Sequence, residues 1–244
     1  MHKFFTNEIE ESTAILRGED HKHLSRVLRL KSGDQVLVND ENGQDYESVI
    51  KSIEKDYTVI TLNNKVEMSN ESNIKITLYQ GLPKSGKLDL IVQKCTELGV
   101  NKIVPVITQR VVVSHNKEFK KLDRLKRIAY EAAKQSKRSL IPAIEEPISF
   151  EELLLAMKEE DVLVVPYENA KDYGVHALKR DLLSLNSIGI LVGPEGGFSE
   201  REINDLIANG AKIITLGKRI LRTETAGFTT AVMIQMLYGD MGGK

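Results

Sequence analysis

Hydrophobic and polar positions alternate in two different ways along the chain, and the change lies near residue 70. Residues 1–70 contain short runs in which apolar and polar side chains alternate, which is typical of strands with one buried face. Residues 71–244 contain continuous apolar runs separated by longer helical patterns, as in buried parallel strands with helices between them. The polar stretch 63–73 lies between the two parts and indicates a linker.

Short strands and tight turns are predicted for the first part. The Asn-Gly pair at 42–43 lies between two β-prone runs and is a good hairpin signal. A helix is predicted near Asp20, which could cap it, because Leu24, Val27 and Leu28 then share one face. We therefore expect a small β-barrel-like domain with one helix and with strands at 36–38, 46–53 and 57–62.

The second part alternates strands and helices, which predicts an α/β domain whose parallel sheet is covered on both faces. Such sheets bind ligands beyond the carboxyl ends of their strands, so the loops that follow the strands are the candidate site. The expected strands are 74–79, 103–107, 162–165, 188–192 and 213–216, and the expected helices are 87–98, 118–139, 150–158, 199–209 and 224–238.

Composition narrows the class of protein. Apolar residues make up 41% and charged residues 28% of the chain, with a net charge of -1, which is ordinary for a soluble globular protein. The single cysteine, Cys95, excludes a disulfide within the chain and lies on an apolar stripe, so we expect it in the core. The five histidines are scattered, and no metal site is predicted. No apolar run approaches the roughly 18 residues of a membrane span, and no signal-peptide core is present, so a cytoplasmic protein is expected.

The segment after the first strand of the second part is close to a phosphate-binding loop. Residues 81–88, GLPKSGKL, match G-x-x-x-x-G-K-[ST] except at the last position, where Leu88 has no hydroxyl to hold magnesium. Pro83 also removes a backbone donor from the loop. The segment therefore indicates a strand-to-helix turn whose Lys84 and Lys87 are either simply exposed or contact a polyanion.

Two other strand exits are rich in glycine or in charge. Residues 193–197, GPEGG, directly follow a predicted buried strand, and Ser199 with Glu202 then forms a capping box that opens a helix. Glycines at a helix start allow a ligand to approach the backbone closely, although many such loops are only tight turns. Residues 217–225 similarly gather charges and hydroxyls between two apolar elements.

Basic residues concentrate on one predicted helix. Residues 117–138 contain nine Lys or Arg and three Asp or Glu, and their apolar residues form a single helical face. The charged face is either solvated or a contact surface for nucleic-acid phosphates. Arg26, Arg29 and Lys31 form a second basic strip in the first part.

Five sequence motifs occur in a fixed order along the chain, and together they are far more specific to one family than any of them is alone. They are HLSRVLR at 23–29 with Gly-Asp at 33–34, KCTELGV at 94–100, EAAKQS at 131–136, GPEGGFS at 193–199 and LRTETA at 221–226. With these motifs the chain resembles, over nearly its whole length, the bacterial ribosomal RNA small-subunit methyltransferase E family, which are uridine N3-methyltransferases of the SPOUT class. Lys3 departs from the family pattern, in which arginine is commoner.

The resemblance implies a fold and a cofactor. It implies a PUA-like RNA-binding β-barrel over residues 1–70, and an α/β domain with a trefoil knot over 71–244. It also implies a site for S-adenosylmethionine in the knotted loops, with S-adenosylhomocysteine as the product, and a homodimer with its sites at the subunit interface. By motif position the cofactor-binding residues are Val165, Pro166, Gly193, Pro194, Glu195, Gly196, Leu216, Gly217 and Leu221.

The resemblance further implies methylation of N3 of one uridine in 16S ribosomal RNA, either free or within the 30S subunit. N3 carries a proton and is a poor nucleophile until it loses that proton. A nearby cation such as Arg222 would lower the pKa of the base, and Glu224 is the nearest candidate to accept the proton. The predicted RNA-binding residues are Arg26, Arg29, Lys84, Lys87, Gln135 and Arg138.

Three alternatives stay open from the residues themselves. A P-loop nucleotidase is disfavoured by Leu88. A non-catalytic RNA-binding module needs only the barrel and the basic helix. It would not need the two glycine-rich loops that follow strands. A ribose 2′-O-methyltransferase of the same superfamily differs from the uridine enzyme only in its target atom, and the family resemblance alone decides between them.

Overall fold

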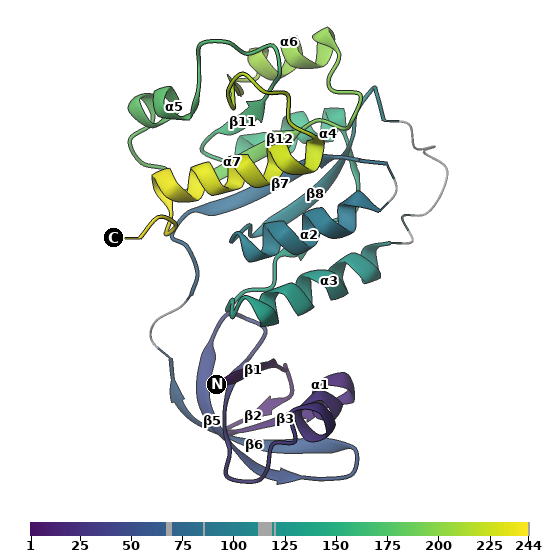
Figure 1. Cartoon of the computed structure of the whole chain (residues 1–244), viewed down its shortest axis with the longest axis vertical. Coiled ribbons are helices and arrows are strands. Elements are labelled where there is room, and N and C mark those ends of the chain that lie inside the picture. Colours follow the sequence, from purple (N-terminus) through teal and green to yellow (C-terminus); the bar gives the residue numbers. More distant parts are fainter. Residues whose placement is uncertain (67–69, 85, 112–118, 120, 244) are drawn as a thin grey trace. The chain divides into compact units, whose positions relative to one another are not determined.

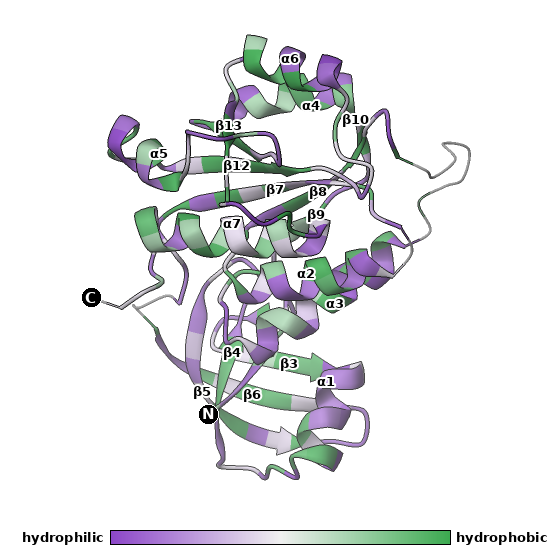
Figure 2. Ribbon diagram, turned by 45° about the horizontal axis from the view of Figure 1, so that its top comes forward, coloured by the Kyte–Doolittle hydropathy of each residue, from purple (hydrophilic) through white to green (hydrophobic). Residues whose placement is uncertain are grey.

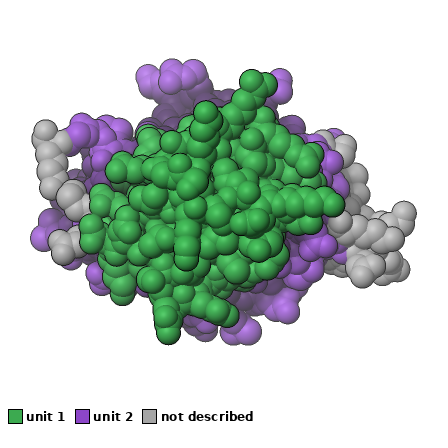
Figure 3. Space-filling view, turned by 90° about the horizontal axis from the view of Figure 1, so that it is seen from below, with its two compact units in different colours: residues 1–71, 133–141 green, residues 72–132, 142–244 purple. Residues whose placement is uncertain are grey.

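Two sheets, one in each part of the chain, form the framework of the computed structural model (Figure 1), which describes residues 1–66, 70–84, 86–111, 119 and 121–243. Contacts divide the chain into two units, coloured in Figure 3: residues 1–71 with 133–141, and residues 72–132 with 142–244. The sequence suggests a single boundary after residue 70, whereas in the structure the segment 133–141 groups with the N-terminal unit.

The N-terminal unit is built on a six-stranded sheet with the order β1-β4-β5-β6-β3-β2. Only β1 and β4 pair in parallel, and the remaining neighbours are antiparallel. Register shifts between Glu47 and Ser48 and between Ile50 and Ser52 mark irregularities in the long β5–β6 pair, which increase its local twist. The strands are β1 (His2–Phe5), β2 (Ile9–Glu10), β3 (Thr13–Arg17), β4 (Gln35–Asn39), β5 (Asp45–Ile53) and β6 (Tyr57–Lys65).

Alternating hydrophobic residues of these strands form the core of the unit, and Figure 2 shows the apolar colour along β3, β4 and β6. The helix α1 (Gly18–Lys22) continues into a π-helical turn, η1 (His23–Val27), which buries Leu24. Two details of the predicted helix are wrong. Asp20 lies inside α1 and does not cap it, and Val27 is 68% exposed, because the π-helical turn moves it off the face of Leu24.

A buried polar network holds the segment 133–141 in the N-terminal unit. The ammonium of Lys3 lies 2.7 Å from Asp45 Oδ2 and donates to the backbone oxygen of Arg138 at 2.6 Å. The hydroxyl of Ser139 donates to the same Asp45 oxygen at 2.6 Å. A buried charge is strongly destabilising unless it is paired, so these residues constrain one another's positions.

The second unit is built on a parallel sheet with the order β10-β8-β7-β12-β11-β13, to which β9 adds by pairing with β8. All pairs are parallel, as predicted. The central β12 lies between β7 and β11, so the carboxyl ends of these strands meet at one edge. The strands are β7 (Lys75–Gly81), β8 (Lys102–Ile107), β9 (Ala143–Ile144), β10 (Ile148–Ser149), β11 (Leu163–Pro166), β12 (Ser187–Val192) and β13 (Lys212–Ile214).

Helices cover both faces of this sheet (Figure 1). Phe150, Leu153 and Leu206, from α4 and α6, pack with Tyr79 and Leu191 on one face. Gly227 of α7 faces Leu78, Gln80 and Val192, which point to the other face because side chains alternate along a strand. The helices are α2 (Lys87–Glu97), α3 (Leu122–Gln135), α4 (Phe150–Ala156), η2 (a 3-10 turn, Met157–Glu159), α5 (Val175–Asp181), α6 (Glu200–Ala208) and α7 (Thr223–Tyr238).

The predicted α/β class and the predicted major elements of the second part are confirmed, with ends that differ by a few residues. The start of the predicted helix 118–139 lies partly outside the described residues, because 118 and 120 are not described. Cys95 is fully buried, and this burial raises the pKa of its thiol to about 12, as expected for a core residue. The trefoil knot remains a prediction. None of the described helices is long and apolar enough to span a membrane.

Candidate active site

Three loops surround a cavity of about 370 Å³ at the carboxyl edge of the parallel sheet. They follow β11, β12 and β13, and the first turn of α7 completes the wall. A smaller cavity of about 90 Å³ adjoins it and shares part of its lining. The residues common to both are Pro166, Glu168, Ile220, Leu221 and Ala226.

The loop after β12 is shaped by close contacts that require glycine. A Cβ on Gly81, at the end of β7, would lie 2.6 Å from the backbone nitrogen of Pro194, so only glycine allows the two strand exits to approach this closely. Gly197 has φ +66° and ends a turn in which its N–H donates to the Pro194 carbonyl at 2.9 Å. The predicted capping box of Ser199 and Glu202 is confirmed and starts α6 directly after this loop.

A chain of hydrogen bonds ties this loop to the start of α7. The Thr223 hydroxyl donates to the Gly193 carbonyl at 2.6 Å and accepts from the Gln80 amide at 2.9 Å. Gln80 is fully buried in β7 and also donates to the Gly81 carbonyl at 3.0 Å. Three segments distant in the sequence are therefore held in one arrangement at the edge of the cavity.

A lysine lies between two carboxylates in the same region. Lys87 Nζ is 3.1 Å from Glu195 Oε1 and 3.2 Å from Glu224 Oε2. Both oxygens of Glu195 also accept from the backbone N–H of Lys84 at 3.1 Å. The group carries two negative charges and one positive charge, so its net charge is negative beside the cavity.

The pKa shifts follow from these contacts. The pKa of Lys87 is raised, because the carboxylates of Glu195 and Glu224 stabilise its charged form. Burial by itself raises the pKa of Glu195, but hydrogen bonds from backbone N–H groups, among them that of Lys84, and from Lys87 outweigh it. The net pKa of Glu195 is therefore below its usual range.

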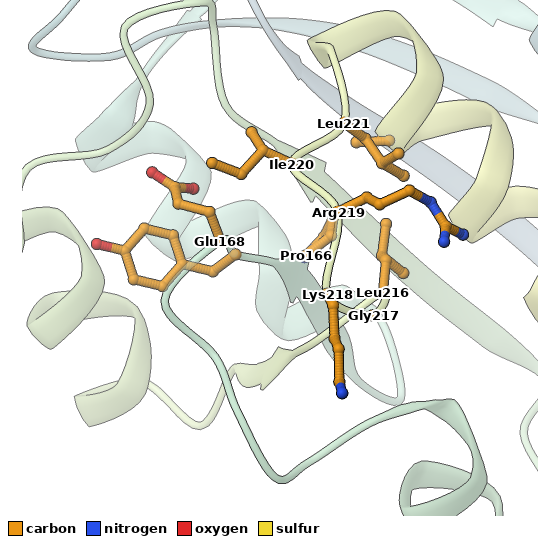
Figure 4. Close-up of a pocket in the computed structure, with 10 residues that line it drawn as sticks. Pro166, Glu168, Leu216, Gly217, Lys218, Arg219, Ile220 and Leu221 are labelled. Carbon is orange, nitrogen blue, oxygen red and sulfur yellow. The ribbon is translucent and has the colours of Figure 1, made fainter.

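The loop from Leu216 to Leu221 presents backbone and apolar groups to the smaller cavity (Figure 4). Ile220 points to the same side as Glu168, whereas Arg219 points away from them. Ile220 is 85% exposed, which is unusual for a large apolar side chain beside two cavities. Among the described residues, no hydrogen bond involves the backbone N–H of Lys218, Arg219 or Ile220, so these donors are open to a ligand.

Comparisons with known proteins match this architecture over nearly the whole chain. Residues 16–62 match the model of an RNA methyltransferase PUA domain, and residues 70–235 match that of an RNA methyltransferase domain. Ribosomal RNA small subunit methyltransferase E of Bacillus subtilis (strain 168) is 37% identical over 226 residues, which are 90% of this chain and 88% of that protein. The chain belongs to the ribosomal RNA small subunit methyltransferase E family.

Two further members of this methyltransferase family support the assignment. The protein of that name from Aquifex aeolicus is 36% identical over 93% of this chain and 95% of its own length. A crystal structure of ribosomal RNA small subunit methyltransferase E from Neisseria gonorrhoeae, bound to S-adenosyl methionine, is 31% identical, with a TM-score of 0.87 over 99% of both chains. The predicted family and the predicted N-terminal PUA domain are therefore confirmed.

Most cofactor-binding residues predicted for this methyltransferase lie around the cavities. Val165 is the exception, because it is fully buried in β11 and lines neither cavity. Glu168 and Ile220 lie in the same loops as these predicted residues and also line both cavities. Sequence reasoning missed Ala226, because its place in the wall depends on how the first turn of α7 packs. The predicted residues in the lining are Pro166, Gly193, Pro194, Glu195, Gly196, Leu216, Gly217 and Leu221.

The predicted catalytic pair of this methyltransferase lies at the start of α7. Arg222 is exposed and lines the larger cavity, and Glu224 reaches the cavity edge through Lys87. Glu224 is in the first turn of α7, where the helix dipole favours a negative charge. The described residues contain no cluster of acidic, histidine or cysteine side chains suited to a metal ion.

The predicted RNA-binding residues differ in how available they are. Arg26, Arg29, Lys84 and Gln135 are exposed. Lys87 lies in the cavity wall and is paired with two carboxylates. The prediction for Arg138 needs correction: the residue is 3% exposed and its guanidinium lies 2.7 Å from Glu71 Oε2, so its charge is already neutralised within the N-terminal unit.

The ion pairs of Glu195 predict how the stability of this methyltransferase depends on pH. Glu195→Gln should lower the Tm at pH 7 by about 2 °C, as expected for a partly exposed ion pair. Because the folded-state pKa of Glu195 is lowered, its stabilisation is present above the usual value of 4.5 and is lost as the pH falls through the lowered value. The Tm difference should therefore shrink as the pH falls below 4.5 in thermal melts, whereas the exposed control Glu146→Gln shows no such difference at any pH. A difference that persists unchanged in acid would contradict the pairing.

Proposed function

We propose that this chain transfers the methyl group of S-adenosylmethionine to N3 of a uridine in small-subunit ribosomal RNA. The observation that carries the proposal is the match of the whole chain, PUA domain and methyltransferase domain together, to relatives that are named for this RNA. The cavity at the carboxyl edge of the sheet supports it, because a small-molecule site is expected there in an α/β domain.

The residues around the two cavities fit S-adenosylmethionine. Leu216, Ile220 and Leu221 offer apolar surface for an adenine ring, and the open backbone N–H groups of the same loop can bond its nitrogen atoms. Glu168 and Glu195 provide carboxylates that suit ribose hydroxyls or a positive charge. The larger cavity is within the roughly 300–1,000 Å³ that is usual for small-molecule sites.

When bound, S-adenosylmethionine supplies a methyl group on a positively charged sulfur. The protein must remove the N3 proton of uridine and place N3 in line with the carbon–sulfur bond. The N3–H bond breaks, an N3–carbon bond forms, and the bonding electrons of the methyl group remain on sulfur. A base in RNA reaches such a site only when it is unstacked and turned into the cavity.

Arg222 and Glu224 are the proposed catalytic residues. The exposed guanidinium of Arg222 can approach the uracil oxygens and stabilise the anion that forms when N3 loses its proton. Glu224 is the proposed acceptor of that proton. The ammonium of its partner Lys87, 3.2 Å away, fixes the position of the Glu224 carboxylate, so we propose a positioning role for Lys87 in place of RNA-phosphate binding.

Arg26, Arg29, Lys84 and Gln135 are the proposed RNA contacts, and they are exposed as this role requires. Arg138 is left out because Glu71 already holds it. A homodimer, a cytoplasmic location and action on either free RNA or the assembled 30S subunit remain predictions from the family resemblance.

Ile220 provides a test of the cofactor site. Ile220→Ala should weaken S-adenosylmethionine binding about fivefold, because a bound adenosyl group would cover much of this side chain. Ile207→Ala is the matched control, because Ile207 is 53% exposed on α6 and lines neither cavity. Isothermal titration calorimetry measures both. Equal affinities of the two variants would place the adenosyl group elsewhere.

Arg222 and Glu224 provide a test of the chemistry. Arg222→Ala and Glu224→Gln should each lower the single-turnover methylation rate by about 100-fold or more, with little change in cofactor affinity. Arg201→Ala and Glu200→Gln, both on the exposed side of α6, are the matched controls. Wild-type single-turnover rates in both site variants would eliminate the assigned roles.

A further inference from the structure

We propose that a cavity in the N-terminal unit holds a backbone phosphate of the RNA substrate, with Lys137 as its main contact. The cavity has a volume of about 160 Å³, and all of its lining belongs to this unit. This proposal rests on the proposed function, because it assumes an RNA substrate. The lining residues are Met1, His2, Lys3, Phe4, His23, Leu28, Lys134, Gln135 and Lys137.

The charges of the lining are not all equally available. Lys3 is paired with Asp45 at 2.7 Å, and Lys134 is paired with Asp20, so both are neutralised within the protein. Lys137 is exposed, and its ammonium forms no ion pair with any side chain that the structure describes. Of the three lysines in the lining, Lys137 is therefore the one whose charge is available to a negatively charged ligand.

Polar donors accompany this lysine. His2 and His23, whose rings carry nitrogens, and Gln135, whose side chain carries an amide, are exposed and line the cavity. A phosphate has several oxygens and accepts hydrogen bonds from donors on different sides. A cavity that offers the ammonium of Lys137, unpaired among the described residues, together with an amide and two imidazoles suits such a ligand better than a cation or a purely apolar group.

The backbone at Lys137 supports a role beyond structure. Helix α3 ends with Lys137 N–H donating to Lys134 O at 3.2 Å and Arg138 N–H donating to Ala133 O at 2.9 Å. Lys137 then has φ +58°, a left-handed position that glycine normally takes at a helix end. Strained positions persist only where the surrounding structure holds them, and they concentrate at functional sites.

The helix end itself does not explain a lysine at this position. A positive charge near a helix C-terminus is favourable, but Lys134 already supplies one in the last turn of α3. The carbonyls of Ala133 and Lys134 accept the hydrogen bonds that close the helix, which reduces their repulsion of an incoming phosphate. Arg29, at the end of η1, also has a left-handed backbone, with φ +53°, so a second basic residue of this unit occupies the same type of position.

The test uses the full-length enzyme, S-adenosylmethionine and small ribosomal subunits that lack the modification. Lys137→Gly removes both the charge and the strain, and should raise the Tm by about 2 °C. The KM for the subunits should increase about fivefold near 0.15 M salt, which is the contribution of one phosphate contact. The kcat should stay unchanged, because Lys137 lines neither of the two active-site cavities. The slope of log KM against log salt concentration should fall by about 1.

Two control variants separate charge from strain. Lys137→Gln keeps the strain and removes the charge, so its KM should increase as in Lys137→Gly without the gain in Tm. Glu11→Gly relieves strain at φ +50° in the turn between β2 and β3, and should raise the Tm with no change in KM. We therefore expect Lys137→Gly to change both Tm and KM, Lys137→Gln to change only KM, and Glu11→Gly to change only Tm. If Lys137 had only a structural role, Lys137→Gln would leave KM unchanged.

The outcomes distinguish failure of this proposal from failure of the proposed function. If the wild type methylates the subunits and the Lys137 variants have its KM and salt slope, the phosphate contact is wrong and the proposed function stands. If inorganic phosphate raises the Tm of the wild type but not of Lys137→Gln, while KM is unchanged, the cavity binds free phosphate and the RNA assignment is overturned. If the wild type does not methylate the subunits at all, both proposals fail.

Discussion

The hydroxyl of Thr223 connects the parts of the molecule on which the candidate active site depends. It donates to the carbonyl of Gly193, in the loop after β12, and accepts from Gln80, which is buried at the end of β7. The start of α7, which contains Arg222 and Glu224, is thereby fixed against the glycine-rich loop. Loss of such a buried hydrogen bond leaves unpaired groups and typically destabilises a protein by about 1–3 kcal/mol. The cavity is thus held in shape by the protein's own hydrogen bonds.

The parallel sheet explains why the cavity lies where it does. Strand β12 has β7 on one side and β11 on the other, so the loops that follow these strands emerge together. Gly81 permits the loops after β7 and β12 to approach, which brings Lys87 within 3.2 Å of both Glu195 and Glu224. The backbone therefore brings Lys87, Glu195 and Glu224, which are far apart in the sequence, together at the carboxyl edge of the parallel sheet.

Local sequence patterns predicted much of this arrangement. The continuous apolar runs predicted β7, β8, β11 and β12, and the spacing of Ser199 and Glu202 predicted the start of α6. These predictions succeeded because an apolar run and a capping box each involve residues that are close together in the sequence. Strand β1 was not predicted, since its buried Lys3 interrupts the apolar pattern and is satisfied by groups far away in the sequence, among them Asp45, 42 residues away, and the Arg138 carbonyl, 135 residues away. The burial of Arg138 depends in the same way on Glu71, 67 residues away. Pairings at such separations leave no local signal in a single sequence.

Nucleoside analysis tests the central claim most directly. The enzyme is incubated with S-adenosylmethionine and small ribosomal subunits that lack the modification, and the RNA is then digested and analysed by mass spectrometry against synthetic standards. The account predicts 3-methyluridine, approaching one per subunit. A 2′-O-methylated nucleoside, another methylated base or no methylation at all would contradict it.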